Sequence, residues 1–239
     1  MPRYLLIRLE GPLQAWGDVA LDPRRPTRAF PSRSGLAGLL ANAFGWEYRD
    51  ADRTTAMQDA LRYAVREDVR PTVLRDYQTA DLDAIGGQGW TRWGVEKRGG
   101  SAKEGTQILE KYYLADGSLL VALTLAEDAP ATLEELAEAL DRPARPLFLG
   151  RKGCPPACSL CEGWIEAETA YEALRQAPLP RDRPSEPAYG FRCWYSPGDG
   201  PDTRPGQTAE VWDRRDFGTQ RFAGSRQVVE GRVHPLEAA

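Results

Sequence analysis

Residues 3–12 read RYLLIRLEGP and residues 34–45 read SGLAGLLANAFG, and these two stretches decide the fold that we expect. The first holds branched and aromatic residues before a Gly-Pro stop, which is typical of a β-strand. The second repeats leucine at helical spacing, with Ser32 or Ser34 to cap its start and Gly45 to end it. The chain therefore begins with a strand that is followed by a helix.

Alternation and apolar runs predict the other elements outward from this start. We expect helices over 54–60 and 132–140, and strands over 61–66, 72–79, 107–114, 119–125 and 146–150. The resulting order is β-α-β, a hairpin excursion, and β-α-β. This order predicts an α+β fold, a ferredoxin-like βαββαβ domain with one inserted hairpin.

Two irregular segments set the domain boundaries that we predict. Residues 80–106 are rich in glycine, and an excursion of this length inside a compact domain is usually functional or disordered. Residues 178–206 are rich in proline and glycine around a short strand at 191–195, and a polar, Arg-rich tail follows. We predict a first domain over 1–165 and a small irregular C-terminal lobe over 166–239.

Composition excludes some classes of protein. The 239 residues include 31 Lys+Arg, 35 Asp+Glu and one histidine, His234, for a formal net charge of −4. No apolar run is long enough for a membrane span or a signal peptide, so we expect a soluble, cytoplasmic protein without a membrane partner. A single histidine weakens any mechanism that needs an imidazole base, and we expect no cofactor and no catalytic residues.

Some segments of the chain are basic, although the net charge of the whole chain is acidic. Residues 23–35 and 142–153 are both basic and hold no acid. If the two loops converge on one groove, their local field can attract phosphates despite the net charge. The alternative is that these arginines are simply solvated. Tryptophans and tyrosines in the loops, such as Trp16, Trp90 and Trp93, are either stacking surfaces for unpaired bases or core residues.

Four cysteines make a zinc site a weak candidate. Cys154, Cys158 and Cys161 fall within eight residues, and Cys193 could supply a fourth thiolate. The Cys-x2-Cys pair is not repeated, however, so free thiols remain the expectation.

Longer motifs resemble a known family. The runs are YLLIRLEGPLQAWG (4–17), RPTRAFPSRSGLAGLL (25–40), LRDYQT (74–79), KYYL (111–114) and LGRKGCP (149–155). Together they are similar to the fifth family of CRISPR-associated (Cas) proteins, in its type I-E branch of CasD-type Cascade subunits. The resemblance covers about residues 1–165.

The resemblance implies a fold and a role. It implies an RRM-type ferredoxin-like domain with a glycine-rich loop after the last core strand and a thumb-like hairpin, here about residues 74–113. It implies binding of the 5′ handle of CRISPR RNA, capping of a filament of CasC-type backbone subunits, and contact with the CasA-type large subunit. Target DNA would be met only through the complex, in antiviral defence.

The candidate RNA-binding residues follow from the basic loops and from the motifs that carry the resemblance. We expect Gln14, Trp16 and Tyr77 to contact bases, and the basic side chains and the amides at Ser34, Gly35, Gly150 and Gly153 to hold phosphates. The full candidate set is Gln14, Trp16, Gly17, Arg24, Arg25, Thr27, Arg28, Arg33, Ser34, Gly35, Arg75, Tyr77, Thr79, Gln107, Lys111, Tyr112, Gly150, Arg151, Lys152 and Gly153.

Two other functions stay open from the sequence. One is a metal-independent endoribonuclease that processes precursor CRISPR RNA, for which Tyr112 with Lys111 could supply the acid and base. The other is a protein scaffold whose arginines do not touch RNA.

Overall fold

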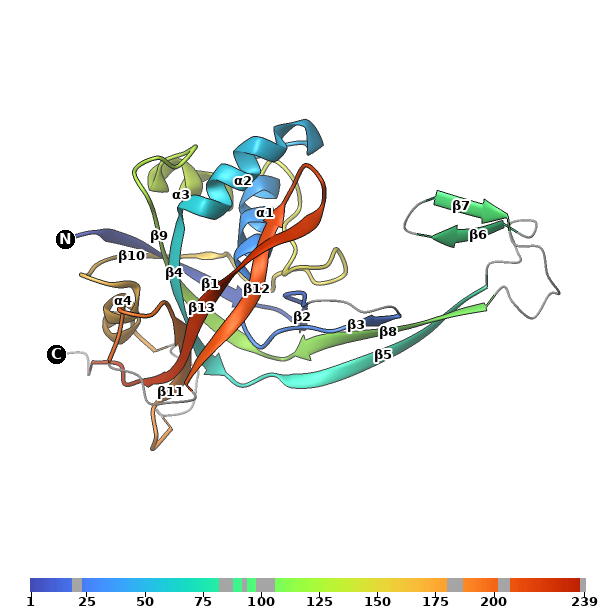
Figure 1. Cartoon of the computed structure of the whole chain (residues 1–239). Coiled ribbons are helices and arrows are strands. Elements are labelled where there is room, and N and C mark those ends of the chain that lie inside the picture. Colours follow the sequence, from blue (N-terminus) through green and yellow to red (C-terminus); the bar gives the residue numbers. More distant parts are fainter. Residues whose placement is uncertain are drawn as a thin grey trace.

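The computed structural model describes residues 1–18, 23–81, 88–91, 94–97, 106–179, 187–201 and 207–236, with side chains for all of these except residues 80–107. None of the helices in this part of the chain is both long and apolar enough to cross a membrane. The architecture is mixed α+β, with one large antiparallel sheet and a few short helices (Figure 1).

The main sheet has seven strands. In spatial order they are β10 (Cys161–Glu166), β1 (Arg3–Glu10), β9 (Ser118–Leu125), β4 (Leu61–Val69), β11 (Phe191–Tyr195), β13 (Arg221–Val233) and β12 (Thr208–Asp216). All neighbouring strands in it are antiparallel.

Helices connect the first four strands in the predicted order. They are α1 (Arg33–Ala43), a 3-10 turn η1 (Tyr48–Asp50) with α2 (Ala51–Ala60), and α3 (Leu133–Asp141). A further helix, α4 (Ala170–Gln176), follows β10 and precedes β11. Helix α1 follows β1, and α3 lies between β9 and β10, so the chain runs β-α-β and then β-α-β. The mixed α+β architecture expected from the sequence is confirmed.

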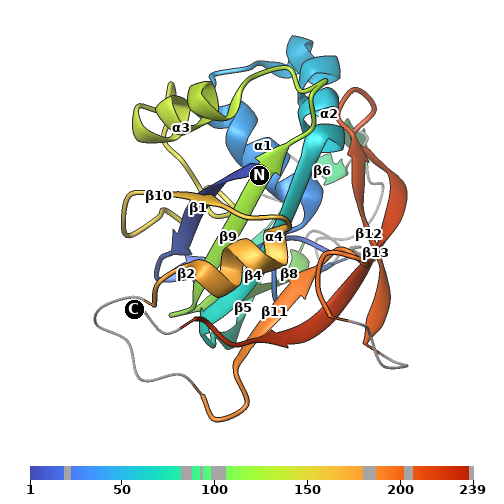
Figure 2. The same ribbon diagram turned by 90° about the vertical axis from the view of Figure 1, so that its left-hand side faces the viewer.

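Both faces of the sheet are covered. Leu5, Ile7 and Leu9 of β1 belong to a core cluster with α1 and α3, whereas Tyr4 and Leu6 belong to a second cluster with α4. Figure 2 shows α4 on one face of the sheet and α1 on the other. Because successive strand side chains point to opposite faces, two covered faces explain why β1 is a continuous apolar run rather than an alternating one.

Helix starts follow the capping residues in the sequence. At α1, the Ser32 hydroxyl accepts a hydrogen bond from the Gly35 amide at 3.1 Å, as the serine cap predicted. At α3, Thr132 and Glu135 form a capping box, which satisfies two amides that would otherwise lack partners.

The predicted strand over 146–150 is wrong. These residues form a loop, and the strand that completes the first four is β10 (Cys161–Glu166). Strand β10 alternates between half-buried and exposed residues and lies at the edge of the sheet, so its apolar signal is weaker than that of the run at 146–150.

The C-terminal segment does not form a separate irregular lobe. The short strand predicted over 191–195 is β11, and it pairs with β4 of the first domain. Strands β13 and β12 then extend the same sheet. Polar residues alternate with buried ones along these strands, and a tail that looks irregular in sequence becomes sheet because β4 offers it a free edge.

The inserted hairpin is a long arm. Strand β5 (Thr72–Asp81) pairs with β8 (Thr106–Ala115) over ten residue pairs, from Thr72 opposite Ala115 to Asp81 opposite Thr106. Figure 1 shows this arm projecting away from the body. Strands β6 (Gln88–Thr91) and β7 (Gly94–Lys97) form a second small hairpin within the insertion. At the base of the arm, β8 also pairs with β2 (Leu13–Gln14) and β3 (Arg24–Arg25).

A buried ionic network lies beneath α4. The Arg66 guanidinium bonds Asp68 and donates to the carbonyls of Leu174, Ala177 and Pro178. Asp68 also accepts from Arg8. Arg66 and Asp68 are almost completely enclosed. The network therefore fastens the end of α4 to β4 and β1, and opposite charge at a helix C-terminus adds to it.

We predict that Arg66→Met destabilises the protein strongly. The change leaves three carbonyls without donors and deprives Asp68 of one of its two cations, so we expect the free energy of unfolding to fall by about 3–5 kcal/mol. Urea unfolding measures this effect. The matched control, Arg142→Met, removes a guanidinium that is 83 % exposed and should stay within about 0.5 kcal/mol of wild type. Equal losses for the two variants would contradict the assignment.

Candidate nucleic-acid interface

Gln14 and Trp16 are core residues, so the expectation that their side chains contact bases is wrong for this structure. Both are fully buried, and the Trp16 indole donates to the Gln14 side-chain oxygen at 3.0 Å. The Gln14 amide nitrogen in turn donates to the carbonyls of Leu9 and Gly117. Neither side chain presents a free face or a free donor to a ligand.

These buried residues organise the loops that surround them. The Trp16 amide donates to the Thr27 hydroxyl at 2.9 Å, and the Trp16 carbonyl accepts from Ser32 at 3.0 Å. Gly17 then turns the chain with a φ of +67°. Thr27 and Gly17, both candidates for RNA contact, therefore shape the loop that carries the arginines.

Gly150 is required by a close backbone approach. The Ala15 amide donates to the Leu149 carbonyl at 2.9 Å, and Gly150 has a φ of +94°. A β-carbon at Gly150 would lie 1.7 Å from the Ala15 carbonyl oxygen. Only glycine fits, because it lacks a β-carbon and adopts positive φ without strain. Gly153 has no such neighbour within 4 Å.

Arg151 joins the loop at 149–154 to the loop at 23–28 and to strand β8 of the arm. Its guanidinium donates to the carbonyls of Tyr112 (3.0 Å) and Arg25 (2.8 Å), and it lies over the Tyr113 ring at 4.7 Å. The loop over 23–28 and the loop over 149–154 thus meet at β8. The convergence expected from the two basic stretches is confirmed, although Arg142 and Arg145 lie outside it. Arg142 flanks α3, and Arg145 donates to carbonyls at Gly45 and Trp46.

Cationic side chains, of which Arg24 and Lys152 are exposed and the others half-buried, gather where the loops meet the arm. Strand β3 places Arg24 opposite Glu110 and Arg25 opposite Lys111. Arg24 is 69 % exposed and lies 3.3 Å from Glu110, while the Lys111 ammonium donates to the Gln78 side chain at 2.7 Å. Lys152 is exposed and has no ion pair within the described ranges. These side chains form the basic patch: Arg24, Arg25, Lys111, Arg151 and Lys152.

One face of the arm carries other candidate residues. Arg75, Tyr77 and Thr79 alternate along β5, so their side chains share a face. Tyr112 faces Arg75 across the pair and donates to Glu110 at 3.1 Å. Tyr77 is 53 % exposed. This face offers a ring and a cation to a ligand. The side chains of Gln107, Trp90 and Trp93 lie outside the described residues.

The start of α1 is already occupied by a carboxylate of the chain. Asp213 of β12 is buried and accepts from the Arg33 amide at 2.9 Å, while Arg226 of β13 holds the same carboxylate. The Gly35 amide is bonded to Ser32. The expectation that amides at Ser34 and Gly35 hold a phosphate is therefore wrong for Gly35. The contact between Asp213 and the start of α1 could not be predicted from the sequence, because Asp213 lies 180 residues from Arg33.

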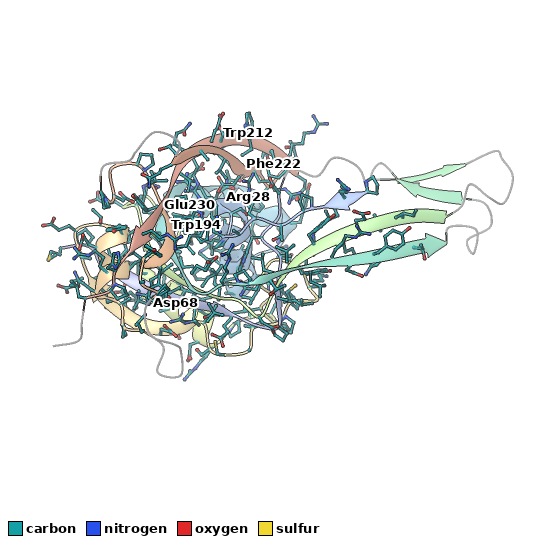
Figure 3. All side chains as sticks on the ribbon, turned by 90° about the horizontal axis from the view of Figure 1, so that it is seen from below. Arg28, Asp68, Trp194, Trp212, Phe222 and Glu230 are labelled. Atoms are coloured by element: carbon teal, nitrogen blue, oxygen red, sulfur yellow. The ribbon has the colours of Figure 1, made fainter. Side chains whose placement is uncertain are left out.

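Arg28 and Arg33 are partly buried and not fully exposed to solvent. Arg28 pairs with Asp18, and burial together with Arg226 lowers the pKa of Arg33. The Nε atoms of both arginines are buried without a hydrogen-bond partner in the described structure. Burial also raises the pKa of Tyr63 to about 12, so its neutral hydroxyl donates to the Pro31 carbonyl and accepts from Arg226. Figure 3 places Arg28 on the body.

The four cysteines do not form a metal site. Cys154 lies in the core cluster beneath α1, whereas Cys193 lies in the cluster beneath α4, on the other face of the sheet. Burial raises the pKa of Cys193 to about 12, which disfavours the thiolate that zinc needs. Within the described ranges, no group of three metal-binding side chains comes together. The weak zinc candidate is contradicted.

We predict that Gly150→Ala disrupts the loop junction and that Gly153→Ala does not. The clash with Ala15 and the positive φ should cost more than about 1 kcal/mol of unfolding free energy, against about 0.5 kcal/mol or less at Gly153. Urea unfolding gives the energies, and hydrogen exchange of the Ala15 amide reports the junction itself. Slow exchange of that amide in Gly150→Ala would show that the close approach is not needed.

Comparison with known proteins identifies the family. A family model described as CRISPR-associated protein (Cas_Cas5) matches residues 4–229. The chain is 36 % identical over 182 residues to the CRISPR system Cascade subunit CasD of Escherichia coli (strain K12), and the match covers 73 % of this chain and 76 % of that protein.

Solved structures agree with this match. A chain of a CRISPR RNA-guided surveillance complex has a TM-score of 0.71 at 27 % identity, covering 97 % of this chain and 90 % of that one. A structure described as a Cas protein has a TM-score of 0.65 at 29 % identity, covering 99 % of this chain and all of that one. The chain therefore belongs to the Cas5 family of CRISPR-associated proteins.

Proposed function

We propose that the protein is the non-catalytic subunit of a type I-E Cascade complex that holds the 5′ handle of CRISPR RNA in the cytoplasm. In this proposal it caps the filament of CasC-type backbone subunits, contacts the CasA-type large subunit, and meets target DNA only through the complex. The β10-β1-β9-β4 part of the sheet is then a ferredoxin-like sheet of the RRM type, which β11, β13 and β12 extend.

The observation that carries the proposal is the basic patch at the base of the arm. Arg24 of β3 lies beside Glu110 on the face of the arm that also carries exposed Arg75 and Tyr77, and exposed Lys152 lies in the loop at 149–154, whereas Lys111 points to the other face. Closely spaced cations bind a phosphate backbone, and an exposed ring stacks on an unpaired base. Arg151 and the buried Gln14–Trp16 pair act by holding this surface in shape.

The geometry weighs against the endoribonuclease alternative. Tyr112 and Lys111 are adjacent on β8, so their side chains point to opposite faces of the arm. Tyr112 bonds Glu110, and Lys111 bonds Gln78. They cannot act together on one 2′-hydroxyl. The single histidine, His234, is exposed and lies against Gly190 after the end of β13.

We predict that Lys152→Glu and Arg75→Glu weaken RNA retention by the assembled complex. Both residues are exposed and have no ion pair in the described ranges, so their replacement should leave the fold intact. Each phosphate contact that is lost should reduce the magnitude of the slope of log affinity against log salt by about 0.7, the value for single strands. The measurement is RNA retained at increasing salt, with Arg142→Glu as control. Charge reversal of Arg151 is a poorer test because it would also break the loop junction.

Retention equal to that of wild type in both variants would favour the scaffold alternative.

We predict no cleavage of repeat RNA by the purified protein in EDTA. The structure offers no paired acid and base among the candidate residues, so RNA incubated with the protein should stay full length on a denaturing gel. Discrete products from a single site, lost in Tyr112→Phe, would establish the endoribonuclease instead.

A further inference from the structure

The buried polar network at the start of α1 holds more positive than negative charge. The Asp213 carboxylate of β12 accepts from the Arg33 amide and pairs with the Arg226 guanidinium of β13. Arg28 pairs with Asp18. Three guanidinium groups therefore accompany two carboxylates. The group left over belongs to Arg33, whose side chain has no ion pair in the described part of the chain.

The three guanidinium groups lie around one buried hydroxyl. The Tyr63 hydroxyl accepts from Arg226 and donates to the Pro31 carbonyl. Burial raises the pKa of Tyr63 to about 12, and nearby positive charges oppose this rise. Those charges belong to Arg226, Arg33 and Arg28. The three side chains are therefore close enough to act on a single group.

Arg28 and Arg33 lack hydrogen-bond acceptors. Among the described residues, their two Nε atoms are the only buried side-chain nitrogen or oxygen atoms without a partner. Burial and the charge of Arg226 lower the pKa of Arg33, so its charged form is unfavourable in the free protein. Because buried donors normally find an acceptor, the missing acceptors point to a group from outside the chain.

The position of these arginines favours RNA as the source of that group. Arg28 keeps 18 % of its side chain exposed and Arg33 is also partly exposed, so a ligand can reach both. Arg28 follows Arg24 and Arg25 of the basic patch in the same loop, so a strand of RNA held at the patch can continue to it. Figure 3 shows Arg28 on the side of Trp194 that faces the arm.

We propose that Arg33 and Arg28 bind one phosphate group of the RNA backbone on the body of the protein, beside the β12–β13 hairpin and in addition to the basic patch. A guanidinium binds a phosphate through two hydrogen bonds, and the phosphate balances the charge of Arg33. The C-terminal hairpin serves this site without touching RNA, because Asp213 holds the Arg33 backbone and neutralises Arg226. The inference rests on the proposed function, since RNA must be bound for the site to be filled.

The first test is Arg33→Met, which removes the charge and keeps an unbranched side chain. We expect this variant to be at least as stable as wild type in urea, because the cation that it lacks is half-buried, unpaired and repelled by Arg226. In the assembled complex, we expect RNA affinity to fall by about tenfold or more, and the magnitude of the salt slope to fall by about 0.7. Unchanged RNA affinity would overturn the proposal, and so would a loss of stability, which would assign Arg33 to the fold.

Two further variants serve as matched controls. Arg142→Met removes an exposed guanidinium outside the site and should change neither stability nor RNA affinity. Arg33→Lys keeps the charge without the planar fork, so we expect it to restore the salt slope and only part of the affinity. An Arg33→Lys complex that releases RNA as readily as Arg33→Met would contradict the role of the charge.

Ethylation interference assigns the phosphate within the RNA. We expect ethylation of one phosphate to weaken binding to wild type and to Lys152→Glu, but to have no further effect on Arg33→Met, which has already lost that contact. A phosphate whose ethylation weakens Arg33→Met as much as wild type at every position would overturn the proposal.

The variants also separate this inference from the proposed function. If Lys152→Glu and Arg75→Glu lose RNA while Arg33→Met retains it, the proposed function stands and the phosphate site is wrong. If all three retain RNA as wild type does, the proposed function fails as well. Release of a protein subunit from Arg33→Met at lower salt, with the RNA retained, would assign the anion to a carboxylate of that subunit and would overturn the RNA assignment.

Discussion

The hydrogen bond between the Trp16 indole and the Gln14 side chain holds together the loops at the base of the arm. Gln14 fastens the end of β1 to the β8–β9 turn, and Trp16 fastens the arginine loop and the start of α1. Between them, Ala15 receives the glycine loop at van der Waals distance. Because buried polar groups must keep their partners, these three residues fix the position of every loop around them.

The same logic explains how an acidic protein can present a cationic surface. Several arginines have structural roles in the fold. Arg66 and Arg8 bind Asp68 beneath α4, and Arg226 binds Asp213 at the start of α1. Arg151 bonds two carbonyls and so gathers the cations that remain exposed. Net charge therefore says little about binding here, since the field at the base of the arm depends on where the charged side chains lie.

The C-terminal strands connect these two regions. Strand β11 lies against β4, whose Arg66 holds α4, and β12 brings Asp213 to α1. Strand β4 therefore joins the C-terminal strands to the first four strands of the sheet.

Local pattern in the sequence was enough to predict β1, α1, β4, the long hairpin and α3, because each has periodicity, caps or turn residues of its own. The sequence motifs were also enough to indicate the family, because each motif is a short run of consecutive residues. The sequence pattern could not predict the roles of Gln14 and Trp16, since a tryptophan in a glycine-bounded loop is equally consistent with a stacking surface and with a core residue.

Only the tertiary structure decided which side chains are buried, which carboxylate caps α1, and that the tail extends the sheet. Sequence by itself determined the order of the elements from β1 to α3 and the supply of cations. The physical reason is range: secondary structure depends on neighbours three or four residues away, whereas burial and ion pairing join residues such as Arg33 and Asp213 that meet only when the chain has folded.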